Sequence, residues 1–281
     1  MLLHKYTLGF SPCPNDTFIF DAIINNKIDT EGISFVPVIA DVEALNHKAF
    51  NKELDITKLS FFAFAIVAND YQLLDSGSAL GKNCGPILIS KKNFKLSEVD
   101  KLTIAIPGKH TTANCLLSIV FPNVKLKKEM LFSEIEEAII NEQVDAGVII
   151  HENRFTYQAK GLKKIIDLGE YWEAETQMPI PLGGIAIKKN IPIEDKQKIN
   201  HLLRKSIDFA MQNPSSSTEF IKKLAQEMDE EVINKHIQLY VNNYTQDLGV
   251  DGKQVIKRFF ERLYQLGITV KIGDNLFLNN L

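Results

Sequence analysis

Short apolar segments alternate with amphipathic segments from the start of the chain to about residue 190, and this alternation constrains the fold more than any other feature. Apolar runs typical of strands lie at 6–10, 32–40 and 54–59. Segments with helical spacing of apolar residues follow them at 16–28, 41–53 and 60–70. Strands that alternate with helices form a parallel or mixed sheet with helices on both faces, so the sequence predicts an α/β fold.

The same order of elements begins again near residue 101. The stretch "KLTIAIPGKHTTANCLLSIVFP" predicts a strand, a glycine loop and a helix, and further strand patterns lie at 144–150, 163–169 and 182–189. From Ile193 onwards the pattern is mostly helical. Because the segment 182–189 is the natural return path, we predict two lobes. The first consists of residues 1–90 and 186–281, and the second, residues 91–185, is inserted into it.

Charge and composition exclude several classes of protein. The chain is 24% charged with a formal net charge of -3, which provides no electrostatic reason to expect nucleic acid. No stretch approaches the roughly 20 apolar residues that span a bilayer, so we expect no membrane partner. The N-terminal residues lack the pattern of an export signal, and the three cysteines have no disulfide-framework or metal-ligand spacing. We therefore expect a cytoplasmic protein with reduced thiols.

Four predicted junctions between a strand and a helix carry small, polar or titratable residues. In open α/β sheets, ligands bind beyond the carboxyl ends of the strands, at the starts of helices. If the two lobes face each other, all four junctions border one cleft. The junctions are Ser11–Asp16, Lys58-Leu59-Ser60, Gly108–Thr112 and His151.

The two junctions of the first lobe also have purely structural interpretations. Pro14 can pre-set the first turn of a helix, and Asn15 or Asp16 can stabilise its start. Ser60 can equally be a plain helix N-cap. Lys58 is more informative, because a lysine at the end of a buried strand must reach water, a carboxylate or an anionic ligand.

The glycine loop "PGKHTTA" resembles a phosphate-binding loop but lacks the Walker spacing. Gly108 allows close approach of a ligand to the backbone, and Thr111 and Thr112 place hydroxyls beside free helix N–H groups. This combination suits a carboxylate or a polyol. The alternative is a capped helix that binds nothing.

His151 follows the apolar run "VDAGVII" and is the strongest candidate for a catalytic base. The positive end of a helix dipole favours neutral imidazole, the form that accepts a proton. His110, in the glycine loop, is the main competitor. His47, His201 and His236 lie on predicted helices away from strand ends and His4 is terminal, so these four are weaker candidates. The sequence shows no Ser/His/Asp order, carboxylate pair or metal-ligand cluster.

Five motifs in order resemble the 1,4-dihydroxy-6-naphthoate synthases of the futalosine route to menaquinone: "SPCPNDTFIF", "DITKLSFFAFA", "PGKHTTA", "AGVIIHENRFTY" and "MPIPLGGIAIKK". The resemblance covers roughly residues 6–190. It implies a two-lobed fold like that of type II periplasmic binding proteins. It also implies a lyase that converts cyclic dehypoxanthinylfutalosine to 1,4-dihydroxy-6-naphthoate and dihydroxyacetone. Because aromatisation makes this reaction favourable, we expect no redox cofactor and no metal.

The resemblance also implies site residues. His151 matches the proposed proton acceptor of the family, and Lys58, Leu59, Ser60, Thr111 and Thr112 match segments that line its substrate site. The substrate carries a carboxylate on an aromatic ring and a sugar-derived ring. Two alternatives remain, chorismate dehydratase of the same pathway and a non-catalytic solute-binding protein. The sequence predicts no oligomeric state.

Overall fold

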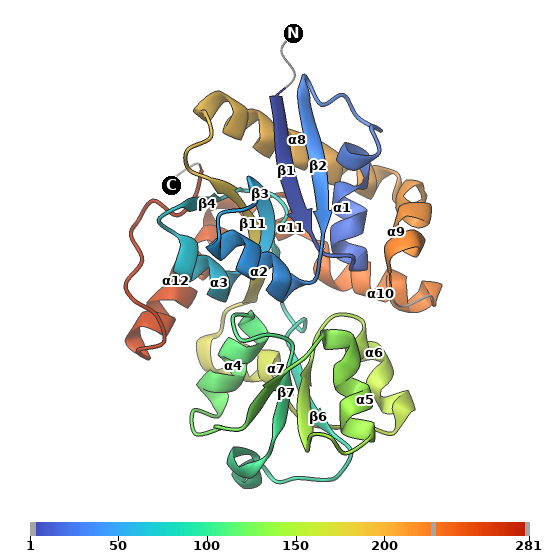
Figure 1. Ribbon diagram of the computed structural model, residues 1–281, viewed down its shortest axis with the longest axis vertical. Helices are drawn as coiled ribbons and strands as arrows, with labels where there is room; N and C mark the ends of the chain where they lie inside the picture. The colour runs from blue at the N-terminus through green and yellow to red at the C-terminus, as the bar shows by residue number, and fades with distance from the viewer. Residues whose placement is uncertain (1–3, 226–228, 279–281) are drawn as a thin grey trace.

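The protein folds into two α/β lobes, one above the other in Figure 1. The structure, a computed structural model, describes residues 4–225 and 229–278. Each lobe contains one mixed sheet with helices packed against it. The predicted fold class, mixed sheets covered by helices, is therefore confirmed.

The sheet of the first lobe has the strand order β2-β1-β3-β11-β4, with β5 also paired to β11. β1 is parallel to β2 and β3, whereas β11 is antiparallel to its three partners. β11 thus brings the chain back from the second lobe, as its sequence predicted. The strands are β1 (His4–Phe10), β2 (Ile33–Ile39), β3 (Ile56–Ser60), β4 (Tyr71–Leu73), β5 (Ala79–Gly81) and β11 (Ile180–Lys188).

The sheet of the second lobe has the order β10-β6-β9-β7-β8. β7 is parallel to β8 and β9, and β6 is antiparallel to β9 and β10. The strands are β6 (Ile87–Ser90), β7 (Ile104–Ile106), β8 (Lys127–Glu129), β9 (Ala146–Ile149) and β10 (Lys163–Asp167). The lobe boundaries predicted from the sequence stay a prediction, since the sheets show only which strands pair.

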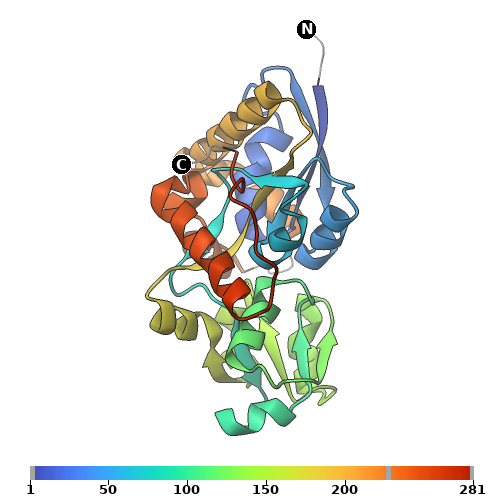
Figure 2. The same ribbon diagram turned by 90° about the vertical axis from the view of Figure 1, so that its left-hand side faces the viewer.

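Helices cover both sheets and make up most of the C-terminal third. Between the strands lie α1 (Pro14–Ile24), α2 (Val42–Phe50), α3 (Phe61–Val67), α4 (Thr112–Val120), α5 (Ile135–Ile140), α6 (Asn153–Thr156) and α7 (Leu168–Thr176). After β11 follow α8 (Ile193–Gln212), α9 (Thr218–Leu224), α10 (Glu230–Tyr240), α11 (Asn243–Gln246) and α12 (Gly249–Gln265). Figure 2 shows α12 running down the side of the upper lobe towards the lower one.

Local sequence explains where the helices at the lobe interface begin. Asp41 caps α2 by accepting hydrogen bonds from the backbone N–H groups of Glu43 and Ala44. Pro14 occupies the first turn of α1, where its missing N–H costs nothing. α3 is apolar on all sides because it packs between the first sheet and the C-terminal helices, where Phe64 stacks on Phe260.

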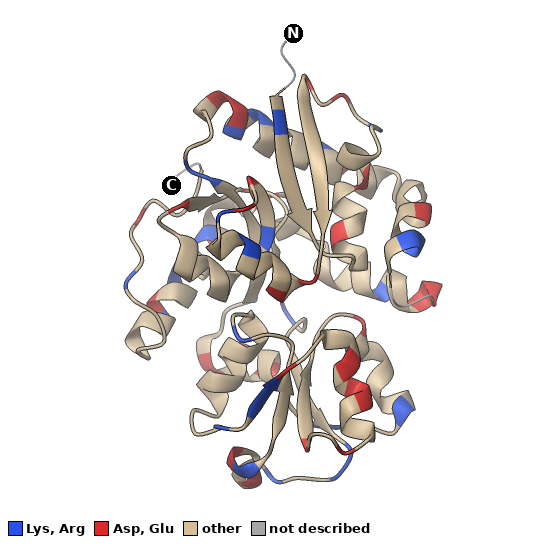
Figure 3. Cartoon of the chain, viewed as in Figure 1, with Lys and Arg blue, Asp and Glu red and all other residues tan. Residues whose placement is uncertain are grey.

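The later helices do more than complete the first lobe. α10 contacts both α1 and β5, so it reaches the face of the first sheet that looks towards the second lobe. α12 packs on α7, where the rings of Phe259 and Trp172 meet edge to face at 5.5 Å. No helix among residues 4–225 and 229–278 is long and apolar enough to cross a membrane. Figure 3 shows both signs of charge on each lobe in the view drawn.

Candidate active site

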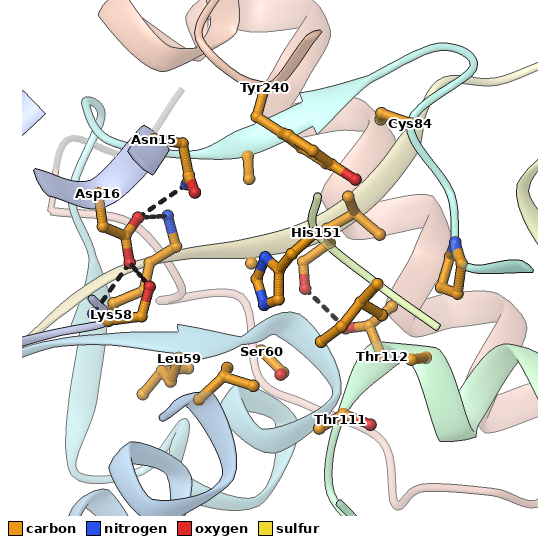
Figure 4. Close-up of a pocket in the computed structure, with 18 residues that line it drawn as sticks. Asn15, Asp16, Lys58, Leu59, Ser60, Cys84, Thr111, Thr112, His151 and Tyr240 are labelled. Carbon is orange, nitrogen blue, oxygen red and sulfur yellow. Dashed lines mark hydrogen bonds and ion pairs between the residues drawn. The ribbon is translucent and has the colours of Figure 1, made fainter. Parts of the chain in front are cut away.

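A cavity lies between the two lobes. Figure 4 shows the side chains that line it, which come from both lobes and from α10. All six residues predicted for the site line this cavity: Lys58, Leu59, Ser60, Thr111, Thr112 and His151. Their roles are still predictions.

The loop at the start of α1, residues 11–16 with Pro12 and Pro14, forms one wall of the cavity. Asp16 is almost completely buried, and its Oδ2 accepts hydrogen bonds from the backbone N–H of Ser11 at 3.1 Å and from its hydroxyl at 2.8 Å. Asn15 Nδ2 donates to Asp16 Oδ1 at 2.9 Å. Neither Asn15 nor Asp16 caps α1 through its side chain, because the cap position is Cys13. The loop therefore presents a fixed carboxylate to the cavity.

Lys58 pairs with a carboxylate, one of the three partners expected for a lysine at the end of a buried strand. Its Nζ lies 2.8 Å from Asp16 Oδ1 and 3.3 Å from the carbonyl oxygen of Gly77 (Figure 4). Both charged side chains are buried, and a buried charge is tolerated only when it is paired and hydrogen-bonded. An ammonium group has three N–H donors, and these contacts use two of them. The third can bind a substrate.

Ser60 is the N-cap residue of α3 by position only. Its side chain makes no capping hydrogen bond, which removes the plain N-cap interpretation. Asn46 Nδ2 donates weakly to Ser60 Oγ at 3.5 Å, so the hydroxyl proton is left to point elsewhere. The neighbouring Leu59 is fully buried and supplies apolar lining.

The two threonines of the glycine loop differ in what they do. Thr111 caps α4, since its Oγ1 accepts from the backbone N–H of Asn114 at 3.2 Å and donates to the carbonyl of Gly108. Thr112 Oγ1 donates to the carbonyl of Leu182 at 2.7 Å and accepts from the backbone N–H of Phe62 at 3.4 Å. Thr112 therefore ties α4 of the second lobe to the first. Both hydroxyls donate within the protein and have lone-pair capacity left for a substrate hydroxyl.

His151 lies two residues after β9 and points into the middle of the cavity (Figure 4). Its backbone has a φ of 59°, in the left-handed region that non-glycine residues seldom adopt. Such a conformation persists only where the surroundings impose it, and it is concentrated at functional sites. Phe132 packs edge-on against the imidazole at a centroid distance of 5.0 Å. The ring is therefore held in one place.

Burial keeps His151 neutral. It lowers the pKa of His151 to about 4; the nearby Asp16 opposes this shift, and the Lys58 ammonium adds to it. The expected helix dipole is not the cause, since α6 begins after His151 and has only four residues, Asn153–Thr156. The sequence prediction of neutral imidazole thus holds, but for a different physical reason.

His236, a weaker candidate from its sequence position, lies beside His151 in the structure. It is fully buried, and its ring stacks on that of His151 with centroids 5.9 Å apart and an interplanar angle of 21°. Its Nε2 lies 2.9 Å from Asn15 Oδ1, and its Nδ1 lies 3.5 Å from a Glu152 carboxylate oxygen. Burial holds the pKa of His236 well below its ordinary value, and electrostatic interactions with His151 and Lys58 lower it further.

Tyr240, one turn further along α10, also lines the cavity. Its ring packs 4.7 Å from that of His236, and burial raises the pKa of its hydroxyl well above the ordinary value. In the sequence, His236 and Tyr240 differ from other helical residues only in lying on the apolar face of an amphipathic helix. Because every core residue of such a helix lies on that face, the pattern does not mark them as site residues.

His110, the competitor for the role of base, does not line the cavity. Its Nδ1 lies 2.8 Å from Glu43 Oε1, and its backbone N–H donates to the same oxygen at 3.0 Å. The loop that contains His110 is thereby attached to α2 of the first lobe. This geometry favours His151.

One group of possible metal ligands includes His151, which lines the cavity. Ligand atoms of Cys13, His151 and Glu152 are within 4.8 Å of one another. Burial raises the pKa of the Cys13 thiol well above its usual range, and a protonated thiol is a poor ligand. All three cysteines of the chain are buried and free in the structure.

Comparison with known proteins decides the family. The family model described as menaquinone biosynthesis matches residues 6–265. A curated 1,4-dihydroxy-6-naphtoate synthase from Thermus thermophilus is 36% identical over 271 residues, 96% of this chain and 98% of that protein. The chain belongs to the 1,4-dihydroxy-6-naphthoate synthase family. The synthase of the same name from Streptomyces coelicolor is 37% identical over 274 residues, 95% of this chain and 96% of its own.

Membership in the synthase family makes the chain an enzyme of menaquinone biosynthesis, consistent with the lyase class expected from its motifs. A crystal structure of an Archaeoglobus fulgidus protein has a TM-score of 0.89 and 34% identity, covering 94% of this chain and 98% of its own. The alkanesulfonate-binding protein SsuA from Xanthomonas axonopodis has a TM-score of 0.72 at 12% identity, with 96% of each chain covered. The latter likeness shows the fold alone, and it confirms the binding-protein-like fold predicted for the synthase.

Proposed function

We propose that this enzyme converts cyclic dehypoxanthinylfutalosine to 1,4-dihydroxy-6-naphthoate and dihydroxyacetone, with His151 as the proton acceptor. The observation that supports this most strongly is a neutral imidazole inside the interlobe cavity, lined also by Lys58 and Asp16. Neutral imidazole can accept a proton, whereas imidazolium cannot. The names of the curated relatives support the reaction.

The polar groups of the cavity divide into two sets that suit the two ends of the substrate. The third N–H of Lys58 and the hydroxyl of Ser60 can both donate, and donors are what a carboxylate requires. The hydroxyls of Thr111 and Thr112 donate to backbone carbonyls, so they can accept from the hydroxyls of the sugar-derived ring. We therefore assign the carboxylate to Lys58 and Ser60 and the sugar-derived ring to the threonines.

The reaction needs a base in the middle of this arrangement. His151 removes a proton from the sugar-derived ring, the ring opens, and a carbon–carbon bond breaks to release the three-carbon unit. The proton returns to that unit as it leaves as dihydroxyacetone, and the remaining rings become aromatic. Substrate and products balance without an oxidant or a reductant. A positioned base of this kind contributes about 10²–10⁴-fold to the rate.

Contacts between the lobes support closure over the substrate. Thr112 bonds to the carbonyl of Leu182 and to Phe62, and Glu43 bonds to His110. Closure excludes water and protects reactive intermediates. We place the reaction in the cytoplasm, as expected from the sequence, and the free state of Cys13, Cys84 and Cys115 supports a reducing compartment.

The purified chain, incubated with cyclic dehypoxanthinylfutalosine and analysed by mass spectrometry, tests the proposal. We expect 1,4-dihydroxy-6-naphthoate and dihydroxyacetone in equal amounts. Chorismate is offered in a parallel incubation. Consumption of chorismate alone would replace the proposal by the dehydratase activity, and tight binding of the first compound without turnover would indicate a solute-binding protein.

A further inference from the structure

Three side chains that commonly bind metals meet outside the cavity, where α2 touches the loop before α4. Glu43 and His47 lie one turn apart on α2, and His110 comes from the other lobe. Glu43 Oε1 is 2.8 Å from His110 Nδ1 and 3.5 Å from His47 Nε2. One ligand atom of each residue lies within 4.8 Å of the other two. The three side chains therefore converge on one point.

The two imidazole rings have an arrangement that suits a shared cation. Their centroids are 5.3 Å apart and their planes are perpendicular. Two imidazoles on one tetrahedral zinc, with Zn–N bonds of about 2.0–2.1 Å, place their ring centres at a distance of about 5 Å. Phe50 packs edge-on against His47 at 5.5 Å and against His110 at 4.9 Å. It keeps both rings in these orientations.

Neighbouring groups also fix the carboxylate. Glu43 Oε2 accepts a hydrogen bond from Asn46 Nδ2 at 2.9 Å, and Oε1 accepts one from the backbone N–H of His110 at 3.0 Å. Gly108 lies so close that a Cβ there would be 2.6 Å from the side chain of Glu43. Outer partners that orient a ligand are a regular part of protein metal sites. Glu43 is held in this way before any cation binds.

We propose that Glu43, His47 and His110 form a binding site for a first-row divalent cation, with Zn²⁺ as the probe of choice. Two imidazole nitrogens and one carboxylate oxygen form the ligand set of several zinc sites with an open fourth position. The His47 side chain is 56% exposed, so solvent reaches that position. Since Glu43 and His47 belong to one lobe and His110 to the other, the cation would hold the lobes together and slow product release.

The spacing in the sequence does not reveal this group. A Glu and a His four residues apart are common on exposed helices, and His110 joins them only after the lobes meet. The inference is independent of the reaction proposed above, because none of the three residues lines the cavity.

Calorimetric titration of the full chain with ZnCl₂ tests the site. We expect the wild type to bind one equivalent, and His47→Ala to bind it more than about tenfold more weakly, as even the loss of an outer partner of a ligand costs this much. His201→Ala, which removes another exposed histidine, is the matched control and should bind like the wild type. His110→Asn repeats the test from the other lobe, and melting curves without metal check that each variant folds.

His151→Asn separates this site from the group of Cys13, His151 and Glu152. It should keep the full equivalent of zinc. Loss of zinc in His151→Asn with normal binding in His47→Ala would move the metal to the cavity and overturn the proposal. Wild-type affinity in both His47→Ala and His110→Asn, or no binding by the wild type, would overturn it as well.

Discussion

His236 stacks on His151, with ring centroids 5.9 Å apart and planes 21° from parallel. Asp16 fixes the orientation of the Asn15 amide: a carboxylate only accepts, so Asn15 Nδ2 faces Asp16 and Oδ1 faces His236. The Nε2 of His236 must then carry the proton. A neutral ring held by this chain of hydrogen bonds supports the imidazole that we propose as the base, which makes His236 a positioning residue.

Replacing His236 tests this support. His236→Phe keeps an aromatic ring against His151 but loses the hydrogen bond to Asn15, and His236→Gln keeps a donor but loses the ring. We expect both to reduce kcat by more than about tenfold with a smaller change in KM, because a displaced base affects the transition state most. In His236→Phe, the Asn15 Oδ1 also loses its donor, which costs about 1–3 kcal/mol of stability and will show in melting curves. Normal kcat in both folded variants would reduce His236 to a core residue.

The pH dependence of kcat/KM tests the state of the base. Burial lowers the pKa of His151 to about 4, so the imidazole is neutral and active above that pH and becomes protonated and inactive below it. Activity should stay level from about pH 8 down to about pH 5 and fall only as the pH approaches 4. Circular dichroism at each pH separates this fall from unfolding. An acid limb near 6.5, the ordinary value for histidine, would contradict a buried neutral base.

Lys58 can be tested for its two partners, Asp16 and the substrate. Lys58→Met leaves the Asp16 carboxylate buried and unpaired, and breaking such a pair costs about 3–5 kcal/mol. The double variant Lys58→Met/Asp16→Asn removes both charges and should recover most of the lost stability. KM should stay high in the double variant, because the substrate carboxylate still lacks its cation. Recovery of both stability and KM would make Lys58 purely structural.

Thr111→Val and Thr112→Val should have different effects, although the two residues are adjacent. Thr111→Val removes the cap of α4 and should lower stability by about 1 kcal/mol. Thr112→Val breaks the link from α4 to Leu182 and Phe62, so it should raise KM more than Thr111→Val does. Melting curves and steady-state kinetics on both variants check this. Wild-type KM values in both variants would show that the loop before α4 only caps the helix and does not bind the substrate.

The sequence predicted the parts of the fold and site that depend on neighbouring residues. The alternation of patterns predicted both sheets, and the ends of the strands that became β3 and β9 indicated Lys58 and His151. It did not predict β4, β5 and β8, which have three residues each and, unlike the equally short β7, do not lie in a continuous apolar run.

The missed parts of the site depend on contacts between distant segments. Tyr240 lines the cavity and His236 stacks on His151 only because α10 packs on α1 and β5. The short α6 also changed the explanation for His151, since its pKa depends on burial by both lobes rather than on a local dipole. Burial of this kind is a property of the assembled fold.

Turnover of cyclic dehypoxanthinylfutalosine by His151→Asn tests the central claim most directly. Asparagine fills much of the same volume and still forms hydrogen bonds, but it cannot accept a proton near neutral pH. We predict that the variant folds and binds product nearly normally, while kcat falls by at least about a hundred-fold. His201→Asn is the control for a surface histidine and should keep wild-type turnover. Near-normal turnover by His151→Asn, together with its loss in His110→Asn, would contradict the account and assign the base to the glycine loop.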